Sequence, residues 1–463
     1  MNHKEKNLIK REMYMEKDSI TGIIKTKTGK AVAFSMDKKE MFDFCFITTD
    51  VYLPQEEVKE TEFMVENGLI YGKTSDNFDI AIYYGKNNLS FCYSRHLMTA
   101  AYFIGLSNIT EYKIEKFHGL MFKGSILKSL FLIEAINTSF KDGKQILEFK
   151  DDAKTYRINT ENFSFDLSIC SPIISSHGIS GNVIKNDQVN LYLKFDEEQP
   201  VDSFFKHYNK IIELISFMTY RQNVNFDEIY LMDYDEDKQM LLKFAEVRII
   251  GNNDIINKNY YSNITFDDLG ESLPNLLRLF YDDKDNKETI MIGFLPKNDK
   301  DLLYMNNDKI KAICSALECE LKFFNEEGIE KNEKLEELIK IVKSQVKEFR
   351  KNDDIMPKNT YNLIFNSINH WSLSLSERVW NMCKEFYECI IRLPFDDTAI
   401  SEERVKKFVK YRNDITHGRY RVLDMEVGLT ALLLSGLVYC NILDRIGIGR
   451  TKIIELCEKK LLR

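Results

Sequence analysis

Apolar residues in the first half of the chain recur in short alternating or β-branched runs, and turn-forming residues separate these runs. They lie at residues 22–24, 42–48, 69–71, 78–84, 162–169, 189–195, 228–232 and 239–247. Alternation with a period of two is typical of strands that have one buried face. Helical spacing interrupts the runs at residues 125–135 and 201–218. The pattern predicts an α+β domain with a mainly antiparallel sheet over residues 19–255, preceded by a charged segment at residues 1–18.

After the polar, turn-rich residues 252–259, apolar side chains are spaced by three and four positions instead of two. Such stripes run from Ile310 to Phe324, from Leu335 to Phe349 and from Leu375 to Cys389. Breaks that contain Gly328, Pro357 or Pro394 separate them. We therefore predict an all-α bundle of about five helices at residues 307–463, with residues 256–306 as a connecting segment.

Composition places the chain among folded cytoplasmic proteins. A length of 463 residues suggests about two or three domains, and 44% apolar residues suffice to fill their cores. The nine cysteines show no Cys-x-x-Cys pair and no spacing typical of zinc ligands, so we expect reduced thiols and neither a metal nor a cofactor. The longest uncharged stretch, Val427–Leu443, contains three polar residues; we predict a buried core helix there, not a membrane span.

The net charge of −8 excludes a general attraction to polyanions, so any RNA contact must come from a local patch. One such patch lies between residues 404 and 421, where Asp414 is the single acid. Its basic residues are Arg404, Lys406, Lys407, Lys410, Arg412, Arg419 and Arg421. A solvated basic face of a helix is the alternative interpretation of this run.

The helix that Ser401 is predicted to cap carries Arg412 where its apolar stripe continues. Val405, Phe408 and Val409 form the stripe, and Arg412 follows Val405 by two turns. A buried guanidinium costs several kcal/mol unless it is paired or serves a site. His417 follows five residues later, and Gly418 easily adopts a left-handed cap, so we expect the helix to end between Arg412 and Gly418.

The run Arg412-Asn413-Asp414-Ile415-Thr416-His417 resembles the signature of the HEPN superfamily: an arginine, four to six residues and a histidine. The resemblance implies a metal-independent endoribonuclease that works as a homodimer, with a site shared by two copies of the motif. Arg412 would bind the scissile phosphate, His417 would act as base or acid, and Asn413 would orient His417 or hold the phosphate. The RNA 2′-hydroxyl would be the nucleophile. Lys406, Lys410, Arg419 and Arg421 are the predicted RNA-binding residues.

Each of these residues also has a structural interpretation. Arg412 can pair with a carboxylate such as Glu318 or Glu320, which lie on another amphipathic helix. His417 can serve as a helix C-cap, which the helix dipole favours. Asn413 can be a simple turn former.

A second resemblance lies in the β-rich half. Residues 98–106, 113–123 and 125–131 are similar to the N-terminal domain of ApeA-type proteins, in which that domain precedes a C-terminal HEPN domain. This resemblance implies abortive-infection defence against phage, with a phage-derived trigger and with tRNA or another structured RNA as target. The alternative function is a non-catalytic HEPN-like module that binds a nucleotide or a partner.

Overall fold

The structure is a computed structural model, and the residues that it describes fall into many segments. These are residues 19–25, 31–37, 45–48, 65–66, 68–83, 96–99, 101–105, 114–131, 136–141, 144–149, 153–171, 174–178, 181–185, 188–249, 263–284, 292–297, 301, 304–324, 333–352, 357–369, 374–394, 399–419 and 422–461. The predicted charged segment 1–18 lies outside them. The chain divides into an N-terminal unit, Met1–Tyr260 with Thr265–Asp282, and a C-terminal unit, Tyr261–Ile264 with Asp283–Arg463.

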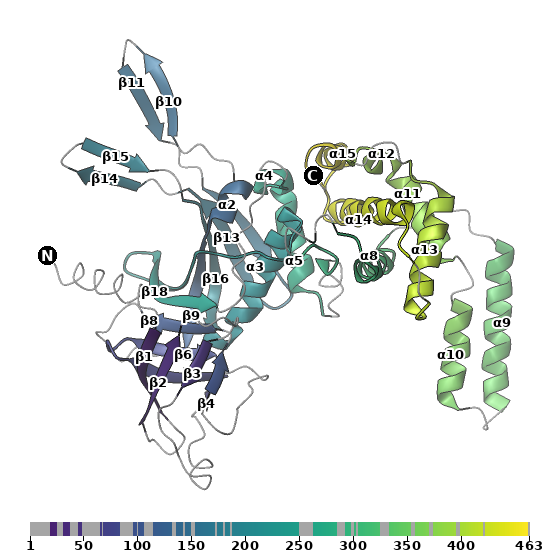
Figure 1. The fold of residues 1–463 in the computed structure, drawn as a ribbon, viewed down its shortest axis with the longest axis horizontal. Helices are drawn as coiled ribbons and strands as arrows, with labels where there is room; N and C mark the ends of the chain where they lie inside the picture. The colour runs from purple at the N-terminus through teal and green to yellow at the C-terminus, as the bar shows by residue number, and fades with distance from the viewer. Residues whose placement is uncertain are drawn as a thin grey trace, which may run out of the picture. The chain divides into compact units, whose positions relative to one another are not determined.

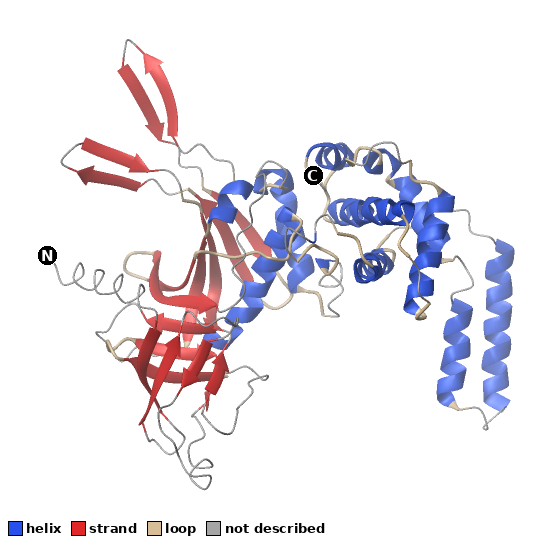
Figure 2. Ribbon diagram, in the orientation of Figure 1, coloured by secondary structure: helices blue, strands red, loops and turns tan. Residues whose placement is uncertain are grey.

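The N-terminal unit is built on strands, as the alternating runs predict (Figures 1 and 2). They are β1 (Ser19–Lys25), β2 (Ala31–Asp37), β3 (Cys45–Thr48), β4 (Val65–Glu66), β5 (Leu69–Thr74), β6 (Asp79–Tyr83), β7 (His96–Thr99), β8 (Ala101–Gly105), β9 (Lys116–Lys123), β10 (Ile136–Lys141), β11 (Lys144–Phe149), β12 (Lys154–Asn159), β13 (Ser164–Cys170), β14 (Ile174–Gly178), β15 (Gly181–Lys185), β16 (Asn190–Pro200), β17 (Glu228–Asp235) and β18 (Met240–Ile249).

Fourteen of these strands form one antiparallel sheet, which confirms the predicted fold class. Their order is β12-β13-β16-β9-β17-β18-β8-β6-β5-β1-β2-β3-β7, with β4 paired to β5. β9 lies between β16 and β17, and its Leu120 is aligned with Leu193 on one side and Leu231 on the other. All three leucines are fully buried, so this part of the sheet holds the core of the unit. β10 with β11 and β14 with β15 form separate hairpins.

Two helices, α3 and α5, are the longest among the described residues of the N-terminal unit and cover part of this sheet (Figure 1). The unit contains α2 (Ser125–Leu130), η2 (Val201–Ser203), α3 (Phe204–Thr219), α4 (Phe266–Leu269), η4 (Gly270–Ser272) and α5 (Leu273–Tyr281). The rings of Phe204 on α3 and Phe103 on β8 pack edge to face, with centroids 5.4 Å apart. The segment expected as a connector, residues 256–306, thus contributes α4 and α5 to the N-terminal unit, because α5 buries its apolar face against α3 and β12.

His207 on α3 is buried among aromatic rings, and this environment favours its neutral form. Its ring lies 4.5 Å from that of Phe195 and 5.3 Å from that of Phe163, and Nδ1 lies 3.3 Å from the Tyr281 hydroxyl oxygen. Burial, reinforced by the nearby charge of Lys206, lowers the pKa of His207 from 6.5 to about 3. Below pH 6.5 the unfolded chain therefore binds a proton that the folded chain does not.

We expect the N-terminal unit to lose stability as the pH falls from 6.5 toward 3, by about 1.4 kcal/mol per pH unit from this group. Hydrogen exchange of the α3 and β16 amides at pH 7, 6 and 5 measures the effect. The double variant His207→Phe/Tyr281→Phe removes the titrating group and leaves no hydroxyl without its partner. Equal pH dependence in wild type and double variant would show that His207 does not control it.

The C-terminal unit is helical, as predicted, but the described residues contain more helices than the expected five. They are α8 (Asn307–Glu320), α9 (Glu333–Asn352), α10 (Lys358–Asn369), α11 (Leu375–Glu385), α12 (Tyr387–Ile390), α13 (Glu402–Thr416), α14 (Met425–Arg445) and α15 (Arg450–Lys459). The stripe predicted as one helix from Leu375 to Cys389 breaks at Phe386, where φ and ψ are −100° and 20°. One apolar pattern therefore continues over two helices, α11 and α12, with Phe386 between them.

α14 forms the centre of this unit and packs against α8, α12, α13 and α15. It is long and apolar enough to cross a membrane by length and composition alone, yet 78% of its most apolar window is buried by the rest of the unit. Gly436 allows a close contact there, because a Cβ atom at this position would lie 2.4 Å from Leu393 Cδ1. This burial agrees with the predicted core helix.

Candidate active site at the end of α13

The predicted site lies on the last turn of α13, and the helix begins and ends as its sequence predicts. The Ser401 hydroxyl accepts a hydrogen bond from the Arg404 backbone N–H at 3.3 Å, which makes Ser401 the N-cap. Val405 and Phe408 are fully buried. The last helical residue is Thr416, His417 occupies the C-cap, and Gly418 takes a left-handed φ of +73°. The expected end of the helix between Arg412 and Gly418 is confirmed.

Arg412 is held against α8 by a carboxylate. Its side chain is 23% exposed, and Nη2 donates to Glu318 Oε1 at 2.7 Å. Nη1 donates to Asn413 Oδ1 at 3.1 Å. The structural interpretation that pairs Arg412 with a carboxylate of the other helix is therefore present in the fold, with Glu318 as the partner. Glu320 is instead fully buried and accepts from Asn441 and Arg445.

His417 is exposed at the end of the helix. Its backbone N–H donates to the Asn413 carbonyl oxygen at 3.0 Å, and its ring makes no hydrogen bond or ion pair within the described part of the chain. Within a single chain, the side chains of Arg412 and Asn413 are thus hydrogen-bonded to each other, but the His417 ring is bonded to neither. The imidazole is available to solvent and to a ligand, while its backbone is fixed by the helix end.

Two further contacts, neither of them predicted from the sequence, order the residues around Arg412: one joins α13 to α8, and the other lies within α8. The Tyr411 hydroxyl donates to Asn307 Oδ1 at 2.8 Å, at the first turn of α8. Cys314, one turn before Glu318, lies with its Sγ 3.9 Å from Glu318 Oε1. Burial raises the pKa of Cys314 to about 12, so this thiol stays protonated and does not compete for the guanidinium of Arg412.

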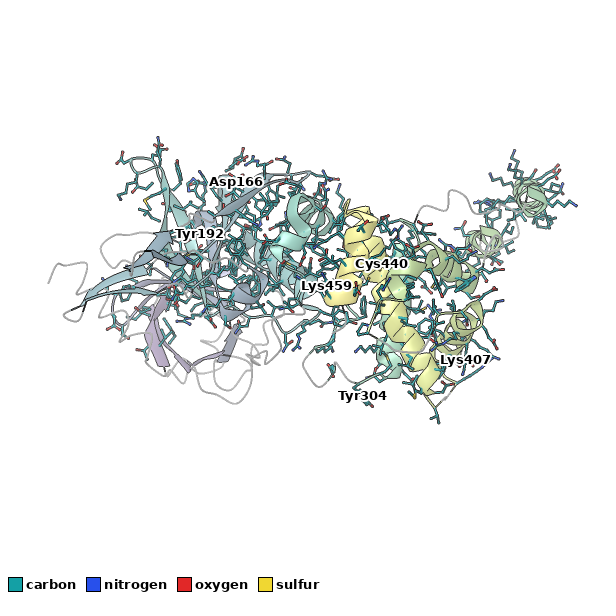
Figure 3. All side chains as sticks on the ribbon, turned by 90° about the horizontal axis from the view of Figure 1, so that it is seen from above. Asp166, Tyr192, Tyr304, Lys407, Cys440 and Lys459 are labelled. Carbon is teal, nitrogen blue, oxygen red and sulfur yellow. The ribbon has the colours of Figure 1, made fainter. Side chains whose placement is uncertain are left out.

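The predicted basic patch is largely neutralised by acids that flank it in sequence. Lys406 pairs with Glu402 at 2.6 Å, and Lys407, labelled in Figure 3, pairs with Asp424 and Glu426. Arg419 pairs with Asp414 at 3.2 Å. The fold brings Glu402, Asp424 and Glu426 close to the patch, so its positive charge is smaller than the residues from 404 to 421 suggest. Exposed pairs of this kind contribute little to stability, so their lysines can exchange partners at small cost.

Two of the four predicted RNA-binding residues thus already have carboxylate partners. Lys410 is exposed and makes no ion pair within the described residues. Arg421 lies outside the residues that the structure describes. Among the described side chains, no three histidines, cysteines or acids gather as metal ligands.

Comparison with known proteins identifies the N-terminal unit. Residues 60–278 match the family model described as ApeA N-terminal domain 1. No curated protein and no solved structure matches the chain. The match includes the central strands β9, β16 and β17, the helices α3 and α4, and the beginning of α5, so it extends into the segment that we expected to be a connector. The chain therefore carries an ApeA N-terminal domain over residues 60–278, as its sequence predicts, and this family places it in the context of anti-phage defence.

Proposed function

We propose that the protein is a metal-independent endoribonuclease of the HEPN type that acts in anti-phage defence. The observation that carries the proposal is the arrangement at the end of α13: a half-buried Arg412 fixed by Glu318 and Asn413, followed by the exposed imidazole of His417. A phosphate needs a rigid pair of donors, and proton transfer needs an imidazole that solvent and substrate can reach.

RNA supplies its own nucleophile, the 2′-hydroxyl, so the protein has to move protons and stabilise charge on the phosphate. Arg412 Nη2 donates to Glu318, but a guanidinium has five N–H donors. Arg412 can therefore bind a phosphate oxygen and keep its hydrogen bond to Glu318 on α8. His417 removes the proton of the 2′-hydroxyl or protonates the leaving 5′-oxygen. One imidazole cannot do both in one step, so the site requires two copies of the chain, related by a twofold axis.

The second candidate function is a non-catalytic module that binds a nucleotide or a partner. The ion pair between Arg412 and Glu318 favours it, because a neutralised arginine attracts phosphate less strongly than an unpaired one. In both functions the ApeA N-terminal domain would sense a phage-derived trigger and act on the helical unit.

RNA cleavage in the presence of EDTA tests the proposal. The full-length protein, alone and with an extract of phage-infected bacteria, is incubated with end-labelled tRNA and with a structured control RNA. We expect cleavage without added metal, and 2′,3′-cyclic phosphate ends on the 5′ products, because the 2′-oxygen attacks the adjacent phosphorus. Products with linear phosphate ends only, or cleavage that EDTA abolishes, would rule out this mechanism.

A further inference from the structure

α9 and α10 pack on each other as a helical hairpin (Figure 1). Lys343 and Lys347 lie over the Phe365 ring, and the Arg350 guanidinium lies 4.1 Å from the centroid of Tyr361, so these contacts define the side of α9 that α10 covers. No other described element shares an extensive contact with either helix.

The remaining side carries large apolar side chains that solvent reaches. Leu338, Ile341 and Phe349 on α9 are 49%, 52% and 56% exposed, and Leu363 on α10 is 71% exposed. We call these four residues the hairpin surface. Single exposed apolar residues are common on protein surfaces, whereas several that lie together usually mark an interaction site.

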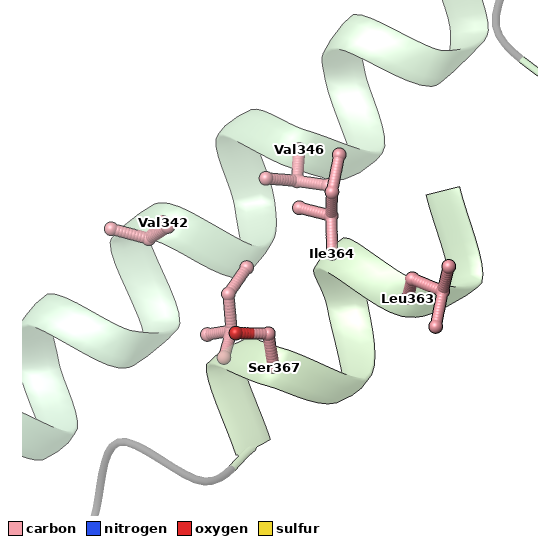
Figure 4. A pocket seen from close by; sticks show the side chains of 6 residues that line it. Val342, Val346, Leu363, Ile364 and Ser367 are labelled. Atoms are coloured by element: carbon pink, nitrogen blue, oxygen red, sulfur yellow. The ribbon is translucent and has the colours of Figure 1, made fainter. Parts of the chain in front are cut away.

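A groove runs into the hairpin surface between the two helices (Figure 4). Its volume is about 380 Å³, and its lining is apolar except for Ser367. Val342 and Val346 form one wall, and Leu363, Ile364 and Ile368 form the other. Phe349 follows Val346 by one turn and Leu338 precedes Val342 by one turn, so the groove and the exposed side chains of α9 share one helix face. A second apolar helix would bury both together.

The charges on α9 indicate what covers this surface. The first ten residues of α9 contain three acids and two bases, whereas the last ten contain one acid and four bases. A second α9 in the antiparallel direction would bring each basic half onto an acidic half, and a parallel one would bring like charges together. The helix is therefore electrostatically complementary to an antiparallel copy of itself.

A specific register follows from the spacing along one edge of α9. Glu337, Ser344 and Lys351 are seven residues apart, so they lie at one position of a heptad, beside Ile341. A twofold axis at Ser344 places Glu337 opposite Lys351 of a second copy. Neither Glu337 nor Lys351 makes an ion pair within the described residues of its own chain.

We propose that the hairpin surface is the self-association site of this protein, where two copies pair their α9 helices antiparallel about Ser344. Each copy inserts apolar side chains of α9 beside the groove of the other, and the four helices form a bundle with an isologous interface. The evidence for self-association, the exposed apolar side chains and the charges of α9, does not depend on RNA cleavage. The inference rests on the proposed function only in that this pairing would supply the second copy that the ribonuclease requires.

Sedimentation equilibrium of the full-length protein measures the association. We expect the wild type to dimerise, Ile341→Asp to be monomeric, and Glu337→Lys or Lys351→Glu to raise the dissociation constant about tenfold. The double variant Glu337→Lys/Lys351→Glu restores the opposite charges and should recover wild-type association. Glu403→Lys on α13 is the matched control, because it makes the same charge change on an exposed helical residue outside the hairpin.

Cysteine cross-linking determines the direction of the helices. An equimolar mixture of Glu337→Cys and Lys351→Cys proteins should form a disulfide-linked dimer under mild oxidation above the wild-type background, and each variant alone should not. A wild type that stays monomeric, or dimers that the charge reversals leave unchanged, would overturn the proposal. Because mass and cross-linking are measured without RNA, failure of the interface is distinguishable from failure of the ribonuclease activity.

Discussion

Replacing His417 by alanine should lower the rate of RNA cleavage by about 10²–10⁴-fold, the usual contribution of a general acid or base. Arg412→Ala should cause a loss of about 10²–10³-fold, because it removes charge that stabilises the phosphate in the transition state. Initial rates with end-labelled RNA in EDTA measure both changes. The imidazole of His417 has no hydrogen bond to lose within the described part of the chain, so its removal should leave the fold intact.

The control for these two variants has to separate chemistry from stability. Glu403→Ala changes an exposed residue of the same helix and should cleave at the wild-type rate. Both tryptophans, Trp371 and Trp380, lie in the C-terminal half, so their fluorescence reports whether the helical unit remains folded in each variant. If His417→Ala is folded and cleaves as fast as the wild type, the imidazole is not the acid or base, and the non-catalytic module becomes the better hypothesis.

Local patterns were sufficient to predict most elements of the fold. The runs at residues 69–71, 162–169 and 228–232 correspond to β5, β13 and β17, because strands with one buried face alternate apolar and polar side chains. The helical pattern at 201–218 corresponds to η2 and α3.

The order of the strands was not predictable from such patterns. β9 pairs with β16 and β17, and about 70 to 110 residues of chain separate these partners along the sequence. This pairing depends on how leucines from three distant segments pack together, which no local period encodes. α5 was assigned to a connector for the same reason, since its apolar face gains a role only when β12 and α3 are beside it.

The candidate site was predictable to a similar extent. The position of Arg412 on an apolar stripe correctly predicted that the guanidinium needs a partner, and Glu318 and Glu320 were the expected alternatives. Sequence could not distinguish them, because they are two residues apart on α8 and the choice depends on the rotation of that helix. The charge of the basic patch was overestimated because Glu402, Asp424 and Glu426 lie just outside it in sequence and beside it in space.

The choice between these two glutamates leads to the largest stability effect that we expect. Glu320 is 1% exposed and accepts hydrogen bonds from Asn441 Nδ2 at 2.6 Å and from Arg445 Nη2 at 3.1 Å. Glu320→Ala removes the carboxylate that both buried donors use, so it should lower the unfolding free energy of the C-terminal unit by about 3–5 kcal/mol. Glu318→Ala, on the same helix, removes a carboxylate that is 39% exposed and should cost less than about 1 kcal/mol.

Urea unfolding followed by tryptophan fluorescence measures this difference, because both tryptophans report on the helical half of the chain. Glu320→Gln keeps an acceptor for Asn441 and loses only the charge that Arg445 needs, so it should fall between the wild type and Glu320→Ala. Nearly equal losses for Glu318→Ala and Glu320→Ala would contradict the assignment of Arg445 and Arg412 to different glutamates. Since α8 also contacts Arg412 and Tyr411 on α13, the buried Glu320 keeps in place the helix that positions the candidate site.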